Sequence, residues 1–284
     1  MRGGRSPWRD AGRRLMGNRA AVVALVLLAA IVLLALVAPW LNPNSYDDVD
    51  WDYIATPPTL ANHHWFGTDA IGRDLFVRTL LGARVSLMVG LVATGVALVI
   101  GVVYGAVAGY AGGRVDALMM RLVDVLYAMP LMFFVIILMV VFGRSILLVF
   151  AAIGGVEWLT MARIVRGQTL ALKRREFVDA ARAAGVRPAG ILAHHIIPNL
   201  MGPVIVYVTL LVPAVILVES FLSFLGLGVQ EPMTSWGVLI ADGAQEMEVA
   251  PHMLFFPAAF LTATLFCFNL IGEGLRGALE PGDR

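Results

Sequence analysis

The 284-residue chain has only one cysteine, Cys267, and only one lysine, Lys173. A single cysteine excludes an internal disulfide and a cysteine metal cluster, and its apolar surroundings predict a buried, inert thiol. A Walker A phosphate loop needs a lysine after a glycine-rich turn. No such turn precedes Lys173 in Ala171-Leu172-Lys173-Arg174, so this route to ATP binding is excluded.

Charge is also scarce, because Asp, Glu, Lys and Arg make up 14% of the residues and the net charge is +1. Neither sign is in excess, so nothing indicates a nucleic acid as a partner. The sequence contains no Ser/His/Asp set, no HExxH and no paired-carboxylate signature. His63 and His64 are adjacent and cannot share one face of a helix or strand, and His194-His195 lies beside a hydrophobic stretch. We therefore expect no catalytic residues, no metal and no cofactor on this chain.

Hydrophobic residues are abundant, at 59%, with a mean hydropathy of +0.82. This composition predicts an all-α integral membrane protein. Six stretches are apolar enough to be transmembrane helices, at residues 20–41, 85–110, 125–143, 145–162, 196–218 and 249–272. The first is long for a signal peptide and is expected to be retained. Pro130 should break the third, and the weakly hydrophobic fourth, with Glu157 near its end, should lie inside the bundle.

The segments between these spans suggest a domain organisation. Residues 1–19 form a basic arm, 42–84 an external loop, 85–276 a core domain that holds the other five spans, and 277–284 a tail. With six spans, 17 of the 21 Lys and Arg residues fall on the same side as the N-terminus. The positive-inside rule then predicts that both termini are cytoplasmic.

The longest polar interval on that side is 176–199, and it reads as two short helices. Asp179 and Arg182 form an i,i+3 pair in the first, Gly185 is placed as a left-handed stop, and Pro188 is placed to open the second. Phe177 and Val178 begin an apolar face that continues through Ala181 and Ala184. The interval is either a docking surface or an amphipathic helix that merely caps the bundle.

This interval resembles the EAA loop of permease subunits in binding-protein-dependent ABC importers. The triad is Asp179-Ala180-Ala181, the loop glycine is Gly185, and the closing pair is Ile197-Pro198. Other matching motifs are GTDxxGRD at 67–74, LSFLGLG at 222–228, Ser235-Trp236-Gly237 and the C-terminal GEGLRGALEP. From about residue 20 onward the chain is similar to the C-type permease of dipeptide, oligopeptide and nickel importers. Departures are Asp for Glu in the triad, Ala250-Pro251-His252 and Gly277.

The resemblance implies a MetI-like type I ABC importer fold in a bacterial plasma (inner) membrane. It implies a second, B-type permease, two ATPases that carry ATP and Mg, an external substrate-binding protein, and lipid around the spans. Di- and oligopeptides are the implied cargo, with nickel chelates or glutathione as alternatives. The residues implied to couple to the ATPases are Glu176, Asp179, Ala180, Ala181, Arg182, Gly185, Ile197 and Pro198.

Several residues within the spans are candidates for the pathway and gate. Pro203 and Pro213 loosen the backbone of the fifth span, and Glu219 with Ser223 lies just beyond it. Glu219 either lines the pathway or a subunit interface, or is an interfacial carboxylate at the end of the span. A stripe of small residues in the second span predicts close helix packing, within the subunit or with a sister subunit, and consists of Ala93, Ala97, Gly101, Gly105 and Gly109.

The external segments carry ten acidic residues against four basic ones, so they should form a negative rim. Candidates for contact with the binding protein are Asp69, Arg73, Asp74 and Trp236. For Arg73 and Asp74, a local salt bridge is the alternative.

Two other functional classes compete with the importer. A secondary transporter or channel would have to relay ions through few intramembrane acids, chiefly Glu157 and Glu219, and the two halves show no internal repeat. A membrane scaffold would need neither proline-bearing spans nor a coupling-type loop. Both are therefore disfavoured.

Overall fold

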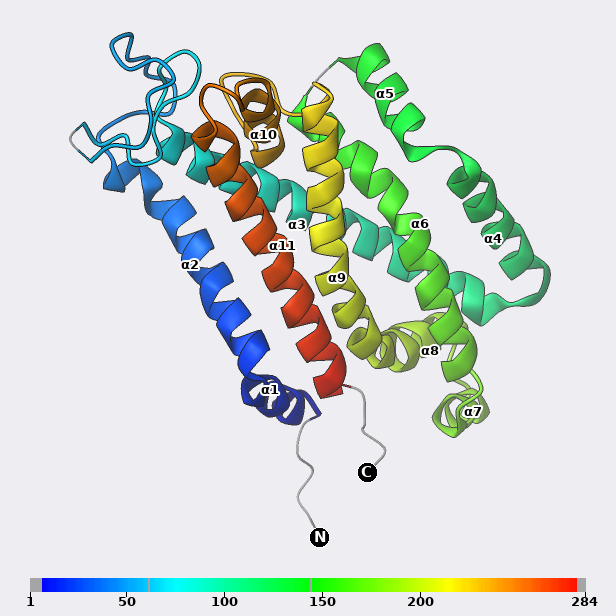
Figure 1. Ribbon diagram of the computed structural model, residues 1–284. Helices are drawn as coiled ribbons and strands as arrows, with labels where there is room; N and C mark the ends of the chain where they lie inside the picture. Colours follow the sequence, from blue (N-terminus) through cyan, green and yellow to red (C-terminus); the bar gives the residue numbers. More distant parts are fainter. Residues whose placement is uncertain (1–6, 61, 144, 280–284) are drawn as a thin grey trace.

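The computed structural model describes residues 7–60, 62–143 and 145–279, and over these residues it contains helices and no strand. The helices are α1 (Pro7–Gly17), α2 (Arg19–Leu41), α3 (Leu75–Ala111), α4 (Gly113–Ala128), α5 (Leu131–Phe142), α6 (Ile146–Leu172), α7 (Glu176–Ala183), α8 (Pro188–Ile191), a π-helical turn (Leu192–Ile196), α9 (Ile197–Phe224), α10 (Trp236–Gln245) and α11 (His252–Leu279). One end of the bundle carries α1, α7 and α8, and the other carries α10 and the loop 42–74 (Figure 1). We call the first the α7 end and the second the loop end.

Five helical segments are long and apolar enough to cross a membrane: α2, α3, α6, the continuous stretch Pro188–Phe224, and α11. A sixth span exists if α4 and α5 count as one, with an 80° bend between Gly113–Ala128 and Phe133–Phe142. The break falls at Met129 and Pro130, as the sequence predicts, because proline cannot continue the hydrogen-bonding ladder of the preceding helix.

The boundaries of the spans differ from those expected from hydropathy. α3 begins at Leu75, so the loop ends at Asp74 rather than residue 84. α6 continues to Leu172 instead of stopping near residue 162. The second helix of the 176–199 interval does not end, but runs through the π-helical turn into α9. The tail contributes residues 277–279 to α11, whereas Glu280–Arg284 and Arg144 lie outside the described residues.

The small residues of α3 pack against α6 within this subunit, which confirms one of the two predicted partners. A Cβ atom on Gly101 would lie 2.5 Å from Cβ of Met161, and one on Gly109 would lie 2.8 Å from the carbonyl oxygen of Arg166. The helices therefore approach more closely than larger side chains would permit. α3 thus serves as the central helix around which α6 and α9 are arranged (Figure 1).

Arg84 is a charged residue in a largely apolar stretch of α3, and it is hydrogen-bonded to backbone carbonyls of α2. Pro39 in α2 has no N–H, which leaves the carbonyl of Ala35 without its usual i+4 partner. Arg84 donates a 2.5 Å hydrogen bond from Nε to this carbonyl and a 2.8 Å bond from Nη2 to the carbonyl of Leu36. Cys267 of α11 belongs to a buried cluster with Ala24 of α2 and is 1% exposed, which confirms the predicted burial of the thiol.

Candidate functional site

The 176–199 interval forms a helical hairpin, which we call the coupling hairpin after the role that the resemblance implies, and its local structure follows the predicted signals. Asp179 accepts a 2.9 Å hydrogen bond from Arg182 one turn later. Gly185 has φ +77°, a left-handed conformation that glycine adopts at low cost. The N–H of Val186 then donates to the carbonyl of Ala181 over 3.1 Å, and α8 opens at Pro188. The left-handed stop, the ion pair and the proline start are all confirmed.

The coupling hairpin is anchored in the core of the bundle. Val178 is fully buried and Ala181 is 7% exposed, and both belong to a hydrophobic cluster that includes residues of α3, α6 and α9. Arg182 lies over the Tyr110 ring at the end of α3, with 5.6 Å between guanidinium carbon and ring centroid. Displacing α7 would therefore disturb the packing of three spans.

The opposite face of the coupling hairpin is open. Glu176, Phe177, Asp179 and Ala180 are exposed, with Phe177 at 39%. Ile197 and Pro198 do not close a loop as the resemblance suggests, because they form the first turn of α9. They link the hairpin directly to a span.

Glu219 lies inside the subunit, 0% exposed, on α9. The hydroxyl of Ser223 donates to Oε1 over 2.7 Å, and that of Ser86 on α3 donates to Oε2 over 3.1 Å. Ser235 in turn bonds to Ser223 over 3.2 Å, and the backbone N–H of Trp236 donates to Ser86 over 3.2 Å. This cluster, the Glu219 network, ties α3, α9 and the start of α10 together. Glu219 is therefore enclosed by protein, five residues before the last residue of α9.

The other pathway candidates lie in different environments. Pro213 is buried, and Ser223 belongs to the Glu219 network. Pro203 is exposed and lines a groove between α6, α9 and the end of α11, together with Tyr207 and Gln168. The structure thus brings Glu219 and Ser223 together and separates both from Pro203.

At the loop end, Asp69 organises a turn and an ion-pair cluster. It accepts hydrogen bonds from the backbone N–H of Ile71 and Arg73, and its Oδ2 accepts a 2.7 Å bond from Nε of Arg73. Arg73 reaches Glu231 over 2.9 Å, which connects the loop to the segment before α10. These residues border a hollow of about 330 Å³ that also contacts Asp242. Burial raises the pKa of the Asp242 carboxyl, and the positive charges of Arg78 and Arg73 oppose that rise.

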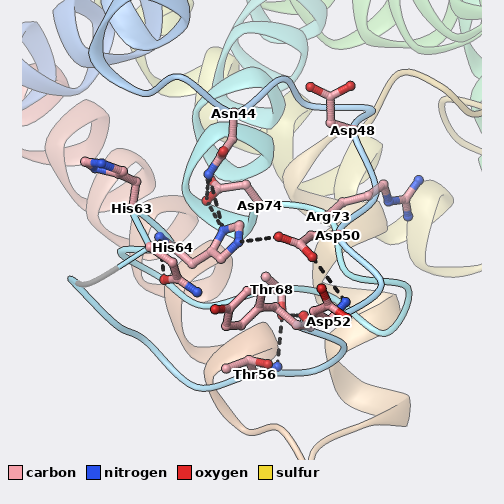
Figure 2. Close-up of polar contacts among 12 residues, drawn as sticks. Asn44, Asp48, Asp50, Asp52, Thr56, His63, His64, Thr68, Arg73 and Asp74 are labelled. Atoms are coloured by element: carbon pink, nitrogen blue, oxygen red, sulfur yellow. Dashed lines mark hydrogen bonds and ion pairs between the residues drawn. The ribbon is translucent and has the colours of Figure 1, made fainter.

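Asp74 has two structural functions (Figure 2). Its Oδ1 accepts a 2.8 Å hydrogen bond from the N–H of Val77 and so caps α3, while its Oδ2 lies 2.8 Å from Nδ1 of His64. Nε2 of His64 lies 3.9 Å from Asp50. Over the described residues, no group of three or more His, Cys, Asp or Glu is placed to hold a metal ion.

Three of the four external contact candidates are interior residues, which corrects the expectation that they face a partner. Asp69 is 5% exposed, Asp74 is 1% and Trp236 is 0%. Trp236 donates from Nε1 to the carbonyl of Thr79 over 3.1 Å. Only Arg73 remains partly exposed, and it pairs with Asp69 and Glu231 rather than with Asp74.

Sequence reasoning missed the ion pairs that attach α4 to α6. Arg166 donates two 2.6 Å hydrogen bonds to the carboxylate of Asp116, and Arg163 donates a 2.7 Å bond to Asp124. The Arg163 guanidinium also lies 4.3 Å from the Tyr127 ring centroid. All four charges were visible in the sequence on one side of the membrane. The pairing was not visible, because the sequence does not show how the break at Pro130 orients α4 relative to α6.

The set of spans with a core-anchored helical hairpin defines a polytopic membrane protein with the architecture of a transport permease. The chain belongs to the family of binding-protein-dependent transport system inner membrane components, whose model matches residues 101–283. Residues 6–58 match the N-terminal TM domain of oligopeptide transport permease C. The resemblance inferred from the motifs is thereby confirmed.

Curated relatives match almost the whole chain. An oligopeptide transport system permease protein from Escherichia coli is 58% identical, covering 99% of this chain and 93% of that protein. The corresponding protein of Haemophilus influenzae is 56% identical over 99% of this chain and 90% of its own length. A dipeptide transport system permease protein of Bacillus subtilis is 46% identical over 96% of this chain and 85% of its own.

Proposed function

We propose that this chain is one of two permease subunits of an ATP-driven importer of di- and oligopeptides. The relatives that match it at 46% to 58% identity are named as oligopeptide or dipeptide permeases, which favours peptide as cargo. The single observation that carries the coupling function is the hairpin itself: one face is packed into the core of α3, α6 and α9, and the other is open.

The proposed motor lies on partner subunits. Two ATPases bind ATP and Mg, and one receives the exposed face of α7 in a surface groove. The basic residues gathered at the α7 end support a cytoplasmic position for this end and for both termini. When the ATPases close, α7 moves as a rigid lever and pulls on α9 through Ile197 and Pro198. A shift of packed helices of this kind switches access between the two faces of the membrane.

An external binding protein would deliver the peptide to the loop end. The loop 42–74 is joined to the segment before α10 by the Arg73–Glu231 pair, and to the start of α11 by a 3.1 Å contact between Nε2 of His252 and the carbonyl of Thr68. They therefore present one continuous surface, and docking on either would involve both. Exposed apolar side chains on this surface include Trp51 and Leu60, at 74% and 83%.

The experiment that tests the proposal is purification of the tagged chain from its native membrane, followed by reconstitution in vesicles with the proteins that accompany it. A second permease and chains with Walker A loops should co-purify, and ATP with a peptide-loaded binding protein should drive peptide uptake. Asp179→Lys, which reverses the charge on the open face, should abolish uptake while the chain still inserts. A chain that purifies alone, or normal uptake by Asp179→Lys, would contradict the proposal.

The cargo is tested separately by offering the same vesicles peptides, glutathione and nickel chelates. Uptake of peptides above the other two supports the proposed substrate class. Uptake of nickel chelates or glutathione alone would keep the ATP-driven mechanism and replace the cargo.

A further inference from the structure

The membrane-spanning part of α6 carries polar side chains on one outward face. Glu157, Thr160 and Gln168 follow one another at intervals of three and eight residues, with Ile164 between the last two, and this spacing places them on one side of a helix. None of these four residues belongs to the buried core. Glu157 lies eleven residues from Ile146, which corresponds to about 16 Å from the end of the helix at about 1.5 Å per residue.

A carboxylate at this depth is costly unless it faces water, a counter-charge or protein. Among the described residues, no Lys, Arg or His forms an ion pair with Glu157. The contrast with Glu219 is clear, because Glu219 is enclosed by hydroxyl groups of its own subunit. Among the described residues of this chain, Glu157 therefore has no counter-charge.

Tyr207 of α9 completes the polar surface from the opposite side. Its hydroxyl lies near the side chains of Thr160 and Glu157 on α6. From Tyr207 toward the α7 end, a groove of about 510 Å³ runs between α6, α9 and the end of α11, with Gln168 and Pro203 on its walls. Gly202 of α9 lines this groove and has open space where a Cβ atom would lie, as does Gly167 beside Gln168 on α6. Gly105 on α3 differs, because a Cβ atom there would overlap with Ala162 and Val165 of α6.

We propose that this α6–α9 face is a wall of the substrate pathway and that Glu157 receives the positively charged amino group of the passing peptide. The carboxylate matches an ammonium group, and the Tyr207 hydroxyl and Gln168 amide match the N–H and C=O groups that every peptide carries. The apolar part of the groove, including Ile164 and Val206, tolerates varied side chains, and the groove also contains the charged Arg276 of α11. This inference rests on the proposed function, since it assumes that the cargo is a peptide.

Cysteine accessibility tests the position of this face. The native thiol, Cys267, is 1% exposed and gives little background. Glu157→Cys and Gln168→Cys, in vesicles that hold the assembled importer, should react with a cationic methanethiosulfonate at least about tenfold faster than Val26→Cys, because a charged reagent partitions poorly into lipid. Val26 is a matched control, being 65% exposed on α2. Trialanine, supplied with its binding protein and ATP, should slow the labelling.

Labelling at the Val26 rate, or labelling that trialanine leaves unchanged, would overturn the inference. The first result would mean that lipid or the second permease covers this face. In either case, uptake of trialanine by vesicles that hold the unchanged protein would show that the proposed function still holds.

Substitutions at Glu157 test the role of the charge. Glu157→Gln should lower trialanine uptake about tenfold, because a charge-assisted hydrogen bond is lost, whereas Glu157→Asp keeps the charge and should stay close to the unchanged protein. ATP hydrolysis stimulated by the loaded binding protein should persist in both, which shows that assembly is intact. Equal uptake by Glu157→Gln and the unchanged protein would overturn the role of the carboxylate. Absence of uptake from the unchanged protein would count against the proposed function instead.

Discussion

Asp116 of α4 and Arg166 of α6 meet through two hydrogen bonds of 2.6 Å, in the fork-to-fork geometry that arginine and carboxylate share. Asp116 is largely buried, with 10% of its side chain exposed, and Arg166 is 35% exposed. The pair lies close to the sharp turn at Gly112 that joins α3 to α4. α4 and α5 form a bent segment with a break at Pro130. The Asp116–Arg166 pair attaches the α4 part of this segment to α6.

Removing this pair should destabilise the protein. Asp116→Asn leaves Arg166 without its counter-charge and should lower the free energy of unfolding by about 1.5–3 kcal/mol. The measurement is thermal unfolding in detergent, followed by tryptophan fluorescence. Asp124→Asn is the matched control, because the Asp124–Arg163 pair is exposed and should cost less than about 1 kcal/mol. Equal losses of unfolding free energy in the two variants would show that the Asp116–Arg166 pair stabilises the protein no more than the exposed pair does.

Two glycines of α3 should respond differently to substitution by alanine, because only one of them contacts α6. Their effects on the free energy of unfolding should differ in sign. In Gly105→Ala the new methyl group meets the carbonyl oxygen of Ala162 and lies 2.9 Å from Cβ of Val165, so the helices must separate. We expect a loss of about 1–3 kcal/mol in the free energy of unfolding. Gly95→Ala meets nothing within 4 Å and should be neutral or stabilising by up to about 1 kcal/mol, through helix propensity. Thermal unfolding of both variants checks the contrast, which a loss in Gly95→Ala alone would refute.

Local signals predicted the coupling hairpin well. Gly185 and Pro188 mark a stop and a start through their own backbone preferences, and Asp179 and Arg182 pair across one turn, so neither needs knowledge of distant residues. The continuation of α8 into α9 was missed because the polar pair His194-His195 looks like a boundary. In the structure it lies in the π-helical turn, and the helix continues.

The start of α3 could not be predicted in the same way. Hydropathy placed the loop boundary after Arg84, since both Arg78 and Arg84 are charged. Their partners come from other elements: Arg78 lies 3.4 Å from Asp69, and Arg84 bonds to the carbonyl of Ala35 that Pro39 leaves free. Charges satisfied by tertiary contacts are compatible with a buried helix, and a sequence window does not contain those contacts.

Gly185 provides a sharp test of the coupling hairpin. Its φ of +77° is unfavourable for a β-branched residue and tolerable for asparagine. Gly185→Val should therefore displace α8 relative to α7 and abolish ATP-dependent uptake, while Gly185→Asn retains most of it. No side chain fills the space around Gly185, so steric overlap does not explain a loss. Uptake by reconstituted vesicles is the measurement, and equal activity of the two variants would refute a requirement for this turn.

Glu219 is a candidate residue of the pathway, and its partners show what a substitution would change. Glu219→Gln preserves the shape but replaces one acceptor oxygen with an amide donor, so either Ser86 or Ser223 must reorient its hydroxyl. One buried hydrogen bond contributes about 1 kcal/mol, and its loss should loosen the junction of α3, α9 and α10. If this junction shifts during transport, uptake should fall about fivefold while the ATPases still co-purify. Thr94→Ala is a suitable control, because that buried hydroxyl of α3 has no hydrogen-bond partner among the described residues. A lower unfolding midpoint with unchanged uptake would limit Glu219 to a structural role.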